Sequence, residues 1–386
     1  MSRRENGTGS ISQRKDGSWT GRIDIGFQSN GKRKVKAVYG KTEAEVKRKL
    51  KDVRNSLIKG EFKQDIKSVT VKTYMDNWLN NYKMYEVKPS TFDTIESTCN
   101  NLIYPYIGDY QFSTIQNIDI QNLINTLTKK DYSYSSIRKV YNYTNSVYEF
   151  AVEHKDVSEN PIKKIVLPKA IKKDISDIVF YNDDEIKLIK KNALVKFPNS
   201  DAYVFRYGYA IILLLYTGMR CGELLGLKWE DVNFENKTIF IQRNLKQVKN
   251  RDEDIKQKFI VVEQTTKTKA GKRYIHLSDM ALEALKYYQS IKTDSPYVLS
   301  TKNSKPVSFR NLDRAFRNIL TRAGITKQYG VHSLRHTFAS MLFKKGVDVK
   351  TVSEILGHSD VGITYNIYIH IINEQKVKAI EQLNDF

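Results

Sequence analysis

The stretch His332-Ser333-Leu334-Arg335-His336-Thr337 carries the strongest chemical signal in the chain. An imidazole and a guanidinium three residues apart, those of His332 and Arg335, lie on one face of a helix. The expected helix begins here, so its N-terminal amides add partial positive charge beside both side chains. The pattern predicts a phosphate-binding site. A helix cap or a surface ion pair would use the same residues, so this stretch alone does not identify an activity.

Three more stretches stand around the first one in the last half of the chain. They are Tyr216-Thr217-Gly218-Met219-Arg220-Cys221-Gly222-Glu223-Leu224, Leu356-Gly357-His358-Ser359 and Thr364-Tyr365-Asn366-Ile367-Tyr368-Ile369-His370. In order, spacing and local context the four stretches resemble the tyrosine recombinase family, also called phage-type integrases. The resemblance spans the region after about residue 175. It implies a site-specific DNA recombinase that cleaves and rejoins strands through a 3′-phosphotyrosine intermediate, to integrate and excise a mobile element or prophage.

The resemblance gives each matching residue a role. Arg220 and Arg335 match the family's clamp on the scissile phosphate, for which a guanidinium fork is suited because it binds two oxygens in one plane. His332 and His358 match histidines that donate hydrogen bonds to the nonbridging oxygens as charge builds. Tyr368 matches the nucleophile, and its place ten residues after His358 selects it among 24 tyrosines.

Two of these assignments leave alternatives open. Tyr365 stands close to Tyr368 and is its rival as nucleophile. In the family, the general acid is a lysine on a β-hairpin. We prefer Lys267 for this role over Lys269. Lys272 is the third lysine of the run, and a place at a solvated hairpin tip would explain it as well as a catalytic role would. Glu223 lies one helical turn beyond Arg220, so we expect it to orient that arginine rather than to contact DNA.

The charge of the chain supports an anionic partner. Lysine and arginine number 64 against 43 acidic residues, a net charge of +21. The excess is nine positive charges in residues 1–65, two in residues 66–174 and ten in residues 175–386. Two separate parts are therefore charged for phosphate, and nucleic acid is the commonest such partner because neutralised phosphates release counterions. Charge that only keeps the surface solvated is the alternative.

The composition also excludes several classes of protein. Cys99 and Cys221 are too few for a disulfide framework or a cysteine-rich metal site, which suits a reducing compartment. The chain has no HExxH, no paired CxxC and no acidic cluster at phosphoryl-transfer spacing, so we expect neither metal nor other cofactor. It has no uncharged apolar window of about 18 residues, so we expect a soluble, cytoplasmic protein without membrane contact.

Strand periodicity marks the N-terminal part. Residues 19–27 alternate apolar and polar side chains, Ser29-Asn30-Gly31 supplies a turn, and residues 32–39 read as a return strand. A capping box at Thr42 and Glu45 then begins a helix. A basic hairpin of this kind fits a major groove, although an ordinary solvated sheet edge is the alternative. The candidate DNA-binding residues are Arg22, Lys32, Arg33, Lys34 and Lys36.

The rest of the chain divides by its pattern. Residues 66–165 read as all helical, with Ser90 as a helix cap and Asn160-Pro161 as the end of the last helix. A lysine-rich stretch follows, and helices and strands mix from Phe180 onward. There we expect a long apolar helix from Tyr203 to Tyr216, the turn Thr217-Gly218, strands at residues 239–241, 259–262 and 273–277, and a helix at about residues 308–323. We therefore expect a multidomain protein: a small β-sheet plus helix N-terminal module, an all-α domain and an α+β catalytic domain. By the family resemblance, residues 1–65 look like an arm-type DNA-binding domain and residues 66–165 like the helical core-binding (SAM-like) domain. Residues 175–386 look like the tyrosine recombinase catalytic domain with a C-terminal tail, and residues 166–174 form the expected linker.

The resemblance further implies the partners. These are double-stranded DNA at attachment sites and the protein itself, as a tetramer on DNA; an excisionase and a host DNA-bending protein are further candidates. The amphipathic tail packs either on its own domain or on a neighbouring protomer. Two other functions share parts of the pattern: a relaxing topoisomerase of type IB chemistry, and a DNA-binding protein that has lost catalysis.

Overall fold

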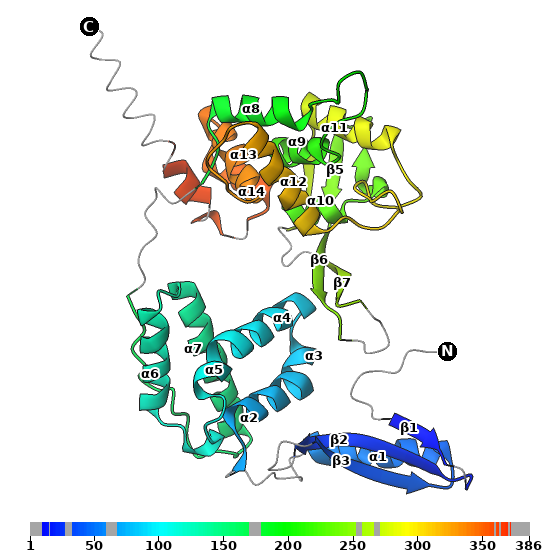
Figure 1. Ribbon diagram of the computed structural model, residues 1–386, viewed down its shortest axis with the longest axis vertical. Coiled ribbons are helices and arrows are strands. Elements are labelled where there is room, and N and C mark those ends of the chain that lie inside the picture. Colours follow the sequence, from blue (N-terminus) through cyan, green and yellow to red (C-terminus); the bar gives the residue numbers. More distant parts are fainter. Residues whose placement is uncertain are drawn as a thin grey trace. The chain divides into compact units, whose positions relative to one another are not determined.

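The computed structural model describes residues 10–14, 16–27, 33–58, 68–169, 179–251, 257–265, 271–358, 360–362, 364–369 and 371. The chain folds into two compact units, Met1–Ile171 and Lys172–Phe386 (Figure 1). The predicted linker, residues 166–174, spans this division, and from residue 170 on it lies outside the described residues. The finer division of the first unit into two domains stays a prediction.

A three-stranded antiparallel sheet, in the order β1-β2-β3, begins the first unit. The strands are β1 (Ser10–Gln13), β2 (Trp19–Phe27) and β3 (Arg33–Gly40), and helix α1 (Glu43–Ile58) packs on one face of the sheet (Figure 1). Ile23 is buried there with Val46 and Leu50. Gly21 must lack a side chain, because a Cβ atom would lie 2.6 Å from Val46. The two predicted strands pair antiparallel and the predicted helix follows them, so these predictions are confirmed, while the predicted turn at residues 29–31 lies outside the described residues. Strand β1, with the polar sequence SISQ, was not predicted.

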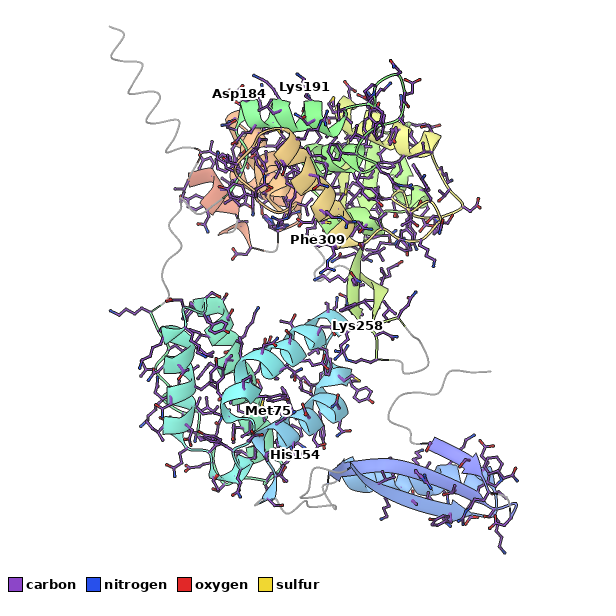
Figure 2. The ribbon with its side chains drawn as sticks, viewed as in Figure 1. Met75, His154, Asp184, Lys191, Lys258 and Phe309 are labelled. Atoms are coloured by element: carbon purple, nitrogen blue, oxygen red, sulfur yellow. The ribbon has the colours of Figure 1, made fainter. Side chains whose placement is uncertain are left out.

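Helices make up the remainder of the first unit. They are α2 (Val71–Trp78), α3 (Met84–Glu86), α4 (Pro89–Thr98), α5 (Tyr104–Ile107), α6 (Asn117–Lys129) and α7 (Tyr134–Glu153), with π-helical turns at Leu79–Lys83 and Cys99–Ile103. Their core contains a stack in which the Phe112 ring lies 3.8 Å from that of Tyr74 and 4.3 Å from that of Tyr148. Met75 is packed inside this region (Figure 2). The all-helical prediction for this part of the chain is confirmed.

Two predicted helix ends in this region were wrong. We expected Ser90 to cap a helix, but the N-cap is Lys88, two residues earlier, and α4 begins at Pro89, whose fixed φ suits the first helical turn. We expected Asn160-Pro161 to end the last helix, but α7 ends at Glu153, capped by His154. Its start is set by Ser133, whose hydroxyl accepts the Ser136 amide at 3.3 Å.

The second unit is built around one apolar helix. This helix, α9 (Gly208–Thr217), has the sequence GYAIILLLYT and is buried on almost every side, as an all-apolar helix must be. Packed around it are α8 (Asp183–Ala193), α10 (Cys221–Gly226), α11 (Asp279–Ser290), α12 (Phe309–Arg322) and α13 (Ser333–Lys344). On α8, Asp184 and Lys191 point away from this core (Figure 2). We predicted that α9 begins at Tyr203, but Tyr203 pairs with Lys196 in an isolated bridge and the helix starts five residues later.

Strands form two small sheets in the second unit. β4 (Val232–Asn233), β5 (Thr238–Ile241) and β8 (Arg273–His276) form an antiparallel sheet in the order β4-β5-β8. β6 (Arg243–Lys249) and β7 (Phe259–Thr265) form an antiparallel hairpin. Strands at β5, β7 and β8 were predicted, whereas β6 was not.

A second, smaller core forms toward the C-terminal end. It contains Ala339 and Phe343 of α13, Val352 and Leu356 of α14 (Val349–Leu356), and Ile367 and Ile371. Residues 364–369 are helical. This core therefore holds α13, α14 and the segment of Tyr368 together. The predicted amphipathic tail from residue 372 on lies outside the described residues.

Candidate active site

A glycine turn places Arg220 at the head of α10. Gly218 ends α9 with φ +62°, a left-handed conformation that favours glycine. A Cβ atom on Gly218 would collide with the ring of Phe338 and lie 2.8 Å from Leu356. The chain reverses here, and Arg220 occupies the N-cap position of α10. Only glycine meets both demands, so the turn that delivers Arg220 depends on it.

Glu223 holds the side chain of Arg220, as predicted. Its carboxylate accepts Arg220 Nη1 at 2.8 Å on Oε1 and the Arg220 backbone amide at 2.8 Å on Oε2. Glu223 is 2% exposed and also accepts Arg273 Nη2 at 2.9 Å. Burial alone would raise the pKa of this carboxyl, but the hydrogen bonds and charges of Arg273 and Arg220 lower it. Glu223 is therefore ionised at neutral pH and fixes Arg220 in place.

Arg335 lies almost fully inside the protein. It is 2% exposed and projects from the first turn of α13. Nη1 donates to the carbonyl of Gly218 at 2.9 Å, and Nη2 donates to that of Leu356 at 2.7 Å. Burial and then the charge of Arg220 lower the pKa of Arg335 to about 9, so the guanidinium stays charged at neutral pH. Its neighbour Arg220 also reaches this end of α14, because Nη2 donates to the carbonyl of Gly357 at 3.2 Å.

Two histidines stand beside the arginines. His332 occupies the N-cap position of α13 and lines a cavity with Arg220. Burial and then the charges of Arg335 and Arg220 lower its pKa. His358 follows the left-handed cap Gly357, and its Nδ1 lies 2.7 Å from the Thr364 hydroxyl. Burial and the same two charges lower the pKa of His358 to about 3. The neutral form of each ring is therefore favoured when no anion is bound.

Tyr368 lies on the helical segment that follows His358. Its ring is partly buried against the small C-terminal core, with its centroid 5.3 Å from that of Phe343. The rival Tyr365 is 50% exposed, and its ring lies 6.0 Å from that of Tyr368. The bond from His358 to Thr364 ties the beginning of this segment to the arginine site. Both tyrosines therefore lie on the segment that follows His358. They differ in packing, because Tyr368 is partly buried and Tyr365 is exposed.

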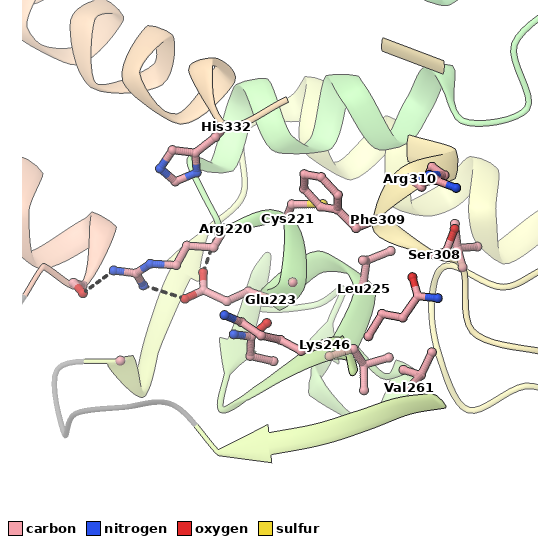
Figure 3. Close-up of a pocket in the computed structure, with 17 residues that line it drawn as sticks. Arg220, Cys221, Glu223, Leu225, Lys246, Val261, Ser308, Phe309, Arg310 and His332 are labelled. Atoms are coloured by element: carbon pink, nitrogen blue, oxygen red, sulfur yellow. Dashed lines mark hydrogen bonds and ion pairs between the residues drawn. The ribbon is translucent and has the colours of Figure 1, made fainter. Parts of the chain in front are cut away.

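A cavity of about 750 Å³ opens beside Arg220 and His332. Figure 3 shows Arg220 between Glu223 and the carbonyl of Gly357, with His332 on the neighbouring element. The lining also includes cationic and apolar side chains: Lys246, Val261, Phe309 and Arg310. A cavity with this lining can accept an anion at the arginines and an apolar group beside it.

The structure brings four of the six predicted catalytic residues together. Arg220 and Arg335 bond to adjacent carbonyls at the end of α14. His332 lines the same cavity as Arg220, and His358 directly follows Gly357, whose carbonyl accepts Arg220 Nη2. Tyr368 is placed on the adjoining segment. Lys267 and its alternative Lys269 lie outside the described residues.

Of the five predicted DNA-binding residues, only the side chains of Arg22 and Lys36 are described. Lys32 lies outside the described residues, as do the side chains of Arg33 and Lys34. Arg22 pairs with Ala37, whereas Lys36 pairs with Ile23, which is buried toward α1. Directly paired residues share a face of a sheet, so Arg22 and Lys36 lie on opposite faces. A single face of the sheet therefore does not present both of them to DNA.

Sequence reasoning missed Arg273, which pairs with Glu223. Its signal was its position: Arg273, Ile275 and Leu277 alternate with exposed residues, so the arginine occupies the buried face of β8. Among the described residues, no group of three or more His, Cys, Asp or Glu side chains could hold a metal ion. No helix in the described part of the chain is long and apolar enough to cross a membrane.

Known proteins resemble this chain in both of its units. Residues 185–375 match the model of the phage integrase family, and residues 70–128 match that of the phage integrase N-terminal SAM-like domain. The chain is 34% identical to a "Tyrosine recombinase XerC-like" protein of Caldanaerobacter subterraneus subsp. tengcongensis, covering 94% of the chain and 95% of the relative. It is 25% identical to the integrase of Staphylococcus phage L54a, covering 88% of the chain and 97% of that protein.

Solved structures share the fold. The Tn1549 transposon integrase in complex with a circular intermediate DNA has a TM-score of 0.63 at 20% identity, covering 81% of this chain and 99% of that one. A lambda integrase dimer bound to a COC′ core site has a TM-score of 0.55 at 16% identity, covering 95% of this chain and 96% of that one.

Proposed function

This chain belongs to the tyrosine recombinase (phage integrase) family of site-specific DNA recombinases, and from that premise we propose which of its residues cleave and rejoin DNA. Enzymes of this kind integrate and excise mobile elements through a covalent bond between a tyrosine and the DNA strand. The proposed catalytic residues are Arg220, Lys267, His332, Arg335, His358 and Tyr368.

One observation carries the assignment of the phosphate site. Arg220 and Arg273 both bond to the carboxylate of Glu223, and Arg335 bonds to the carbonyls of Gly218 and Leu356 beside them. Three guanidinium groups thus stand with one carboxylate, an excess of two positive charges. A phosphodiester carries one negative charge, and its pentacoordinate transition state approaches two. Fixed cations that match the charge of the transition state lower the barrier more than cations that must first reorganise. The cluster therefore performs the work that a metal ion performs in other phosphoryl-transfer enzymes.

The remaining groups complete the reaction. The Tyr368 hydroxyl releases its proton to water as its oxygen attacks phosphorus in line, the bond to the 5′ oxygen breaks, and Lys267 gives the departing oxygen a proton. His332 and His358 donate hydrogen bonds to the nonbridging oxygens. Because a phosphodiester is exchanged for a phosphotyrosine ester, the bond energy is retained, and a 5′ hydroxyl from a second duplex can reverse the step without ATP.

The rest of the chain binds and arranges the DNA. Residues 1–65 bind arm-type sites, residues 66–165 bind the core site, and residues 175–386 carry out catalysis. Four protomers assemble on two duplexes, with an excisionase and a host DNA-bending protein as further partners. The positive excess of residues 1–65 and 175–386, and the separate hydrophobic cluster of the N-terminal sheet, support this division.

A nicked suicide substrate tests the assignment of Tyr368. On such DNA the released strand end diffuses away, so cleavage leaves a covalent adduct that survives denaturing electrophoresis. The wild-type chain forms the adduct, and Tyr368→Phe abolishes it without weakening DNA binding, because the phenyl ring keeps its packing against Phe343. Tyr365→Phe is the matched control and keeps the adduct. An adduct that persists in Tyr368→Phe and disappears in Tyr365→Phe would assign the nucleophile to Tyr365.

A further inference from the structure

Arg273 is a buried cation at the first position of β8. Its side chain is 7% exposed, and three of its nitrogens are bonded inside the protein. Nη2 and Nη1 donate to the two oxygens of Glu223 at 2.9 and 3.2 Å, and Nε donates to the carbonyl of Ile355 at 2.6 Å. Because a buried charge is costly unless it is paired and hydrogen-bonded, these contacts define where Arg273 can lie. It has little freedom to contact DNA itself.

The contacts of Arg273 determine the orientation of Glu223. On each carboxylate oxygen, one N–H comes from Arg220 and one from Arg273. Without Arg273, both remaining donors would belong to Arg220, and the carboxylate and the guanidinium could shift together. With Arg273 present, Glu223 is fixed from a second element, β8, and Arg220 has a rigid partner.

A second set of contacts ends on the same helix. The carbonyls of Ile355, Leu356 and Gly357 are consecutive at the end of α14. They accept Arg273 Nε at 2.6 Å, Arg335 Nη2 at 2.7 Å and Arg220 Nη2 at 3.2 Å, respectively. A helix C-terminus carries partial negative charge, which favours cations there. Arg273 is the member of this set that also bonds to Glu223 through both of its η nitrogens, so it joins the end of α14 to the partner of Arg220.

We infer that Arg273 is a positioning residue, which holds Glu223 and the end of α14 so that Arg220 presents its guanidinium to the scissile phosphate. The inference rests on the proposed role of Arg220. Arg273 does not touch the reacting atoms, so its loss slows cleavage without weakening the binding of DNA. The defect must also depend on the charge of the scissile phosphate, since that charge is what Arg220 meets.

Two variants test the inference. Arg273→Met removes every contact, and it lowers the rate of single-turnover cleavage of a nicked substrate about 10²-fold at saturating DNA, as expected when a catalytic group is misplaced by about 1 Å. Arg273→Lys keeps a positive charge beside Glu223, so the buried carboxylate stays compensated and the chain folds. A lysine cannot bond to both Glu223 oxygens and to Ile355 at once, so this variant also cleaves more slowly.

The decisive measurement compares two substrates. In a methylphosphonate, a methyl group replaces one nonbridging oxygen of the scissile phosphate and removes its charge. A misplaced Arg220 slows cleavage of this substrate less, because hydrogen bonds to a neutral acceptor are worth roughly half of those to a charged one. The loss of cleavage rate in both Arg273 variants therefore shrinks to about tenfold or less. Arg220→Met, the benchmark, shows the same dependence on substrate.

Arg243→Met is the matched control. Arg243 is also a largely buried arginine, 12% exposed and paired with Asp231 at 2.6 Å, but it does not contact Glu223. Any loss of cleavage rate in Arg243→Met is therefore equal on the phosphodiester and the methylphosphonate. Equal defects of the Arg273 variants on both substrates, or cleavage by Arg273→Lys at the wild-type rate, would overturn the inference. Absence of an adduct with the wild-type chain would instead contradict the proposed site itself.

Discussion

Gly218 shows how much of the active site depends on single residues. It combines a left-handed backbone with close contacts to Phe338 and Leu356, and its own carbonyl accepts Arg335 Nη1 at 2.9 Å. The turn thus touches α13 and α14 and delivers Arg220 two residues later. The dipeptide Thr217-Gly218 predicted a turn from the sequence. The contacts that make glycine obligatory come from residues more than 100 positions away, and no local pattern reveals them.

Gly218→Ala should therefore destabilise the second unit strongly. The left-handed backbone costs an alanine about 1–2 kcal/mol, and forcing a methyl group against a packed ring adds about 1–3 kcal/mol. Gly346→Ala is the control, because Gly346 has φ +81° but nothing within 4 Å of its Cβ position, so only the backbone cost applies. Urea unfolding compares the two variants. Equal losses of stability would show that the contacts of Gly218 can relax freely.

His336 gives the second unit a dependence on pH. Burial, then the charges of His332 and Arg335, lower its pKa from 6.5 to about 4. Above pH 6.5 both folded and unfolded chains hold this ring neutral. Between pH 6.5 and 4 only the unfolded chain binds the proton, so the free energy of unfolding falls by up to about 1.4 kcal/mol per pH unit as the pH drops.

His336→Gln should make that fall shallower. The measurement is urea unfolding at pH 7, 6 and 5, and the readout is the slope of stability against pH, which a uniform loss of packing does not alter. His332 and His358, whose pKa values are also lowered, continue to contribute to the slope in the variant. Identical slopes for wild type and variant would mean that His336 takes up a proton as readily in the folded chain as in the unfolded one.

The β6–β7 hairpin illustrates what patterns in the sequence can and cannot predict for an element. Its buried residues Leu245 and Val248 are three apart, with the exposed Lys246 and Gln247 between them, so β6 lacks the period of two that identifies a strand. In α12, by contrast, Leu312, Phe316, Ile319 and Leu320 follow the helical period, and the helix was predicted to within one residue at each end. The contact of Arg273 with Glu223 was missed for a related reason. Arg273 stands at the end of a basic run, and a charged residue in such a run is expected to be exposed, although its position in β8 is a buried one.

Asp231 anchors this hairpin at its base. The carboxylate is almost fully buried and accepts Arg243 Nη1 at 2.6 Å and Gln242 Nε2 at 2.7 Å. Removing one partner of a buried pair leaves the other charge uncompensated, so Asp231→Ala should cost about 3 kcal/mol. Glu230 contacts the same arginine at 2.8 Å, but its side chain is 65% exposed. Glu230→Ala should therefore cost less than about 1 kcal/mol.

Equilibrium unfolding of the two alanine variants checks this difference. The comparison is internal, because both variants lose one carboxylate from Arg243. A Glu230→Ala variant as destabilised as Asp231→Ala would show that distance, rather than burial, sets the strength of the anchor.

At the scale of the whole molecule, the distribution of charge and the hydrophobic clusters each divide the chain into parts. Residues 1–65 and 175–386 carry most of the positive excess, while residues 66–174 are nearly neutral. In the first unit, the cluster of Ile23, Val46, Leu50 and Val53 is separate from the hydrophobic cluster of the helices. The charge of residues 1–65 and 175–386 is therefore the basis for our proposal that these parts bind the DNA. The catalytic constellation needed four distant stretches to be recognised together, since no single one of them identifies the site.

The separate cluster leads to a prediction about a shortened chain, residues 66–386. If the N-terminal sheet binds its own DNA sites, this chain should still form the covalent adduct on a short nicked duplex, because every proposed catalytic residue is retained. Its affinity for longer DNA should depend less steeply on salt, because residues 1–65 bring nine excess positive charges and each neutralised phosphate adds about 0.9 to the slope of log K against log salt. Circular dichroism establishes that the helices are intact, and a filter-binding series at several salt concentrations gives the two slopes. An intact shortened chain with the full-length slope would assign the DNA contacts to the other parts of the molecule, and loss of the adduct would show that the sheet takes part in cleavage.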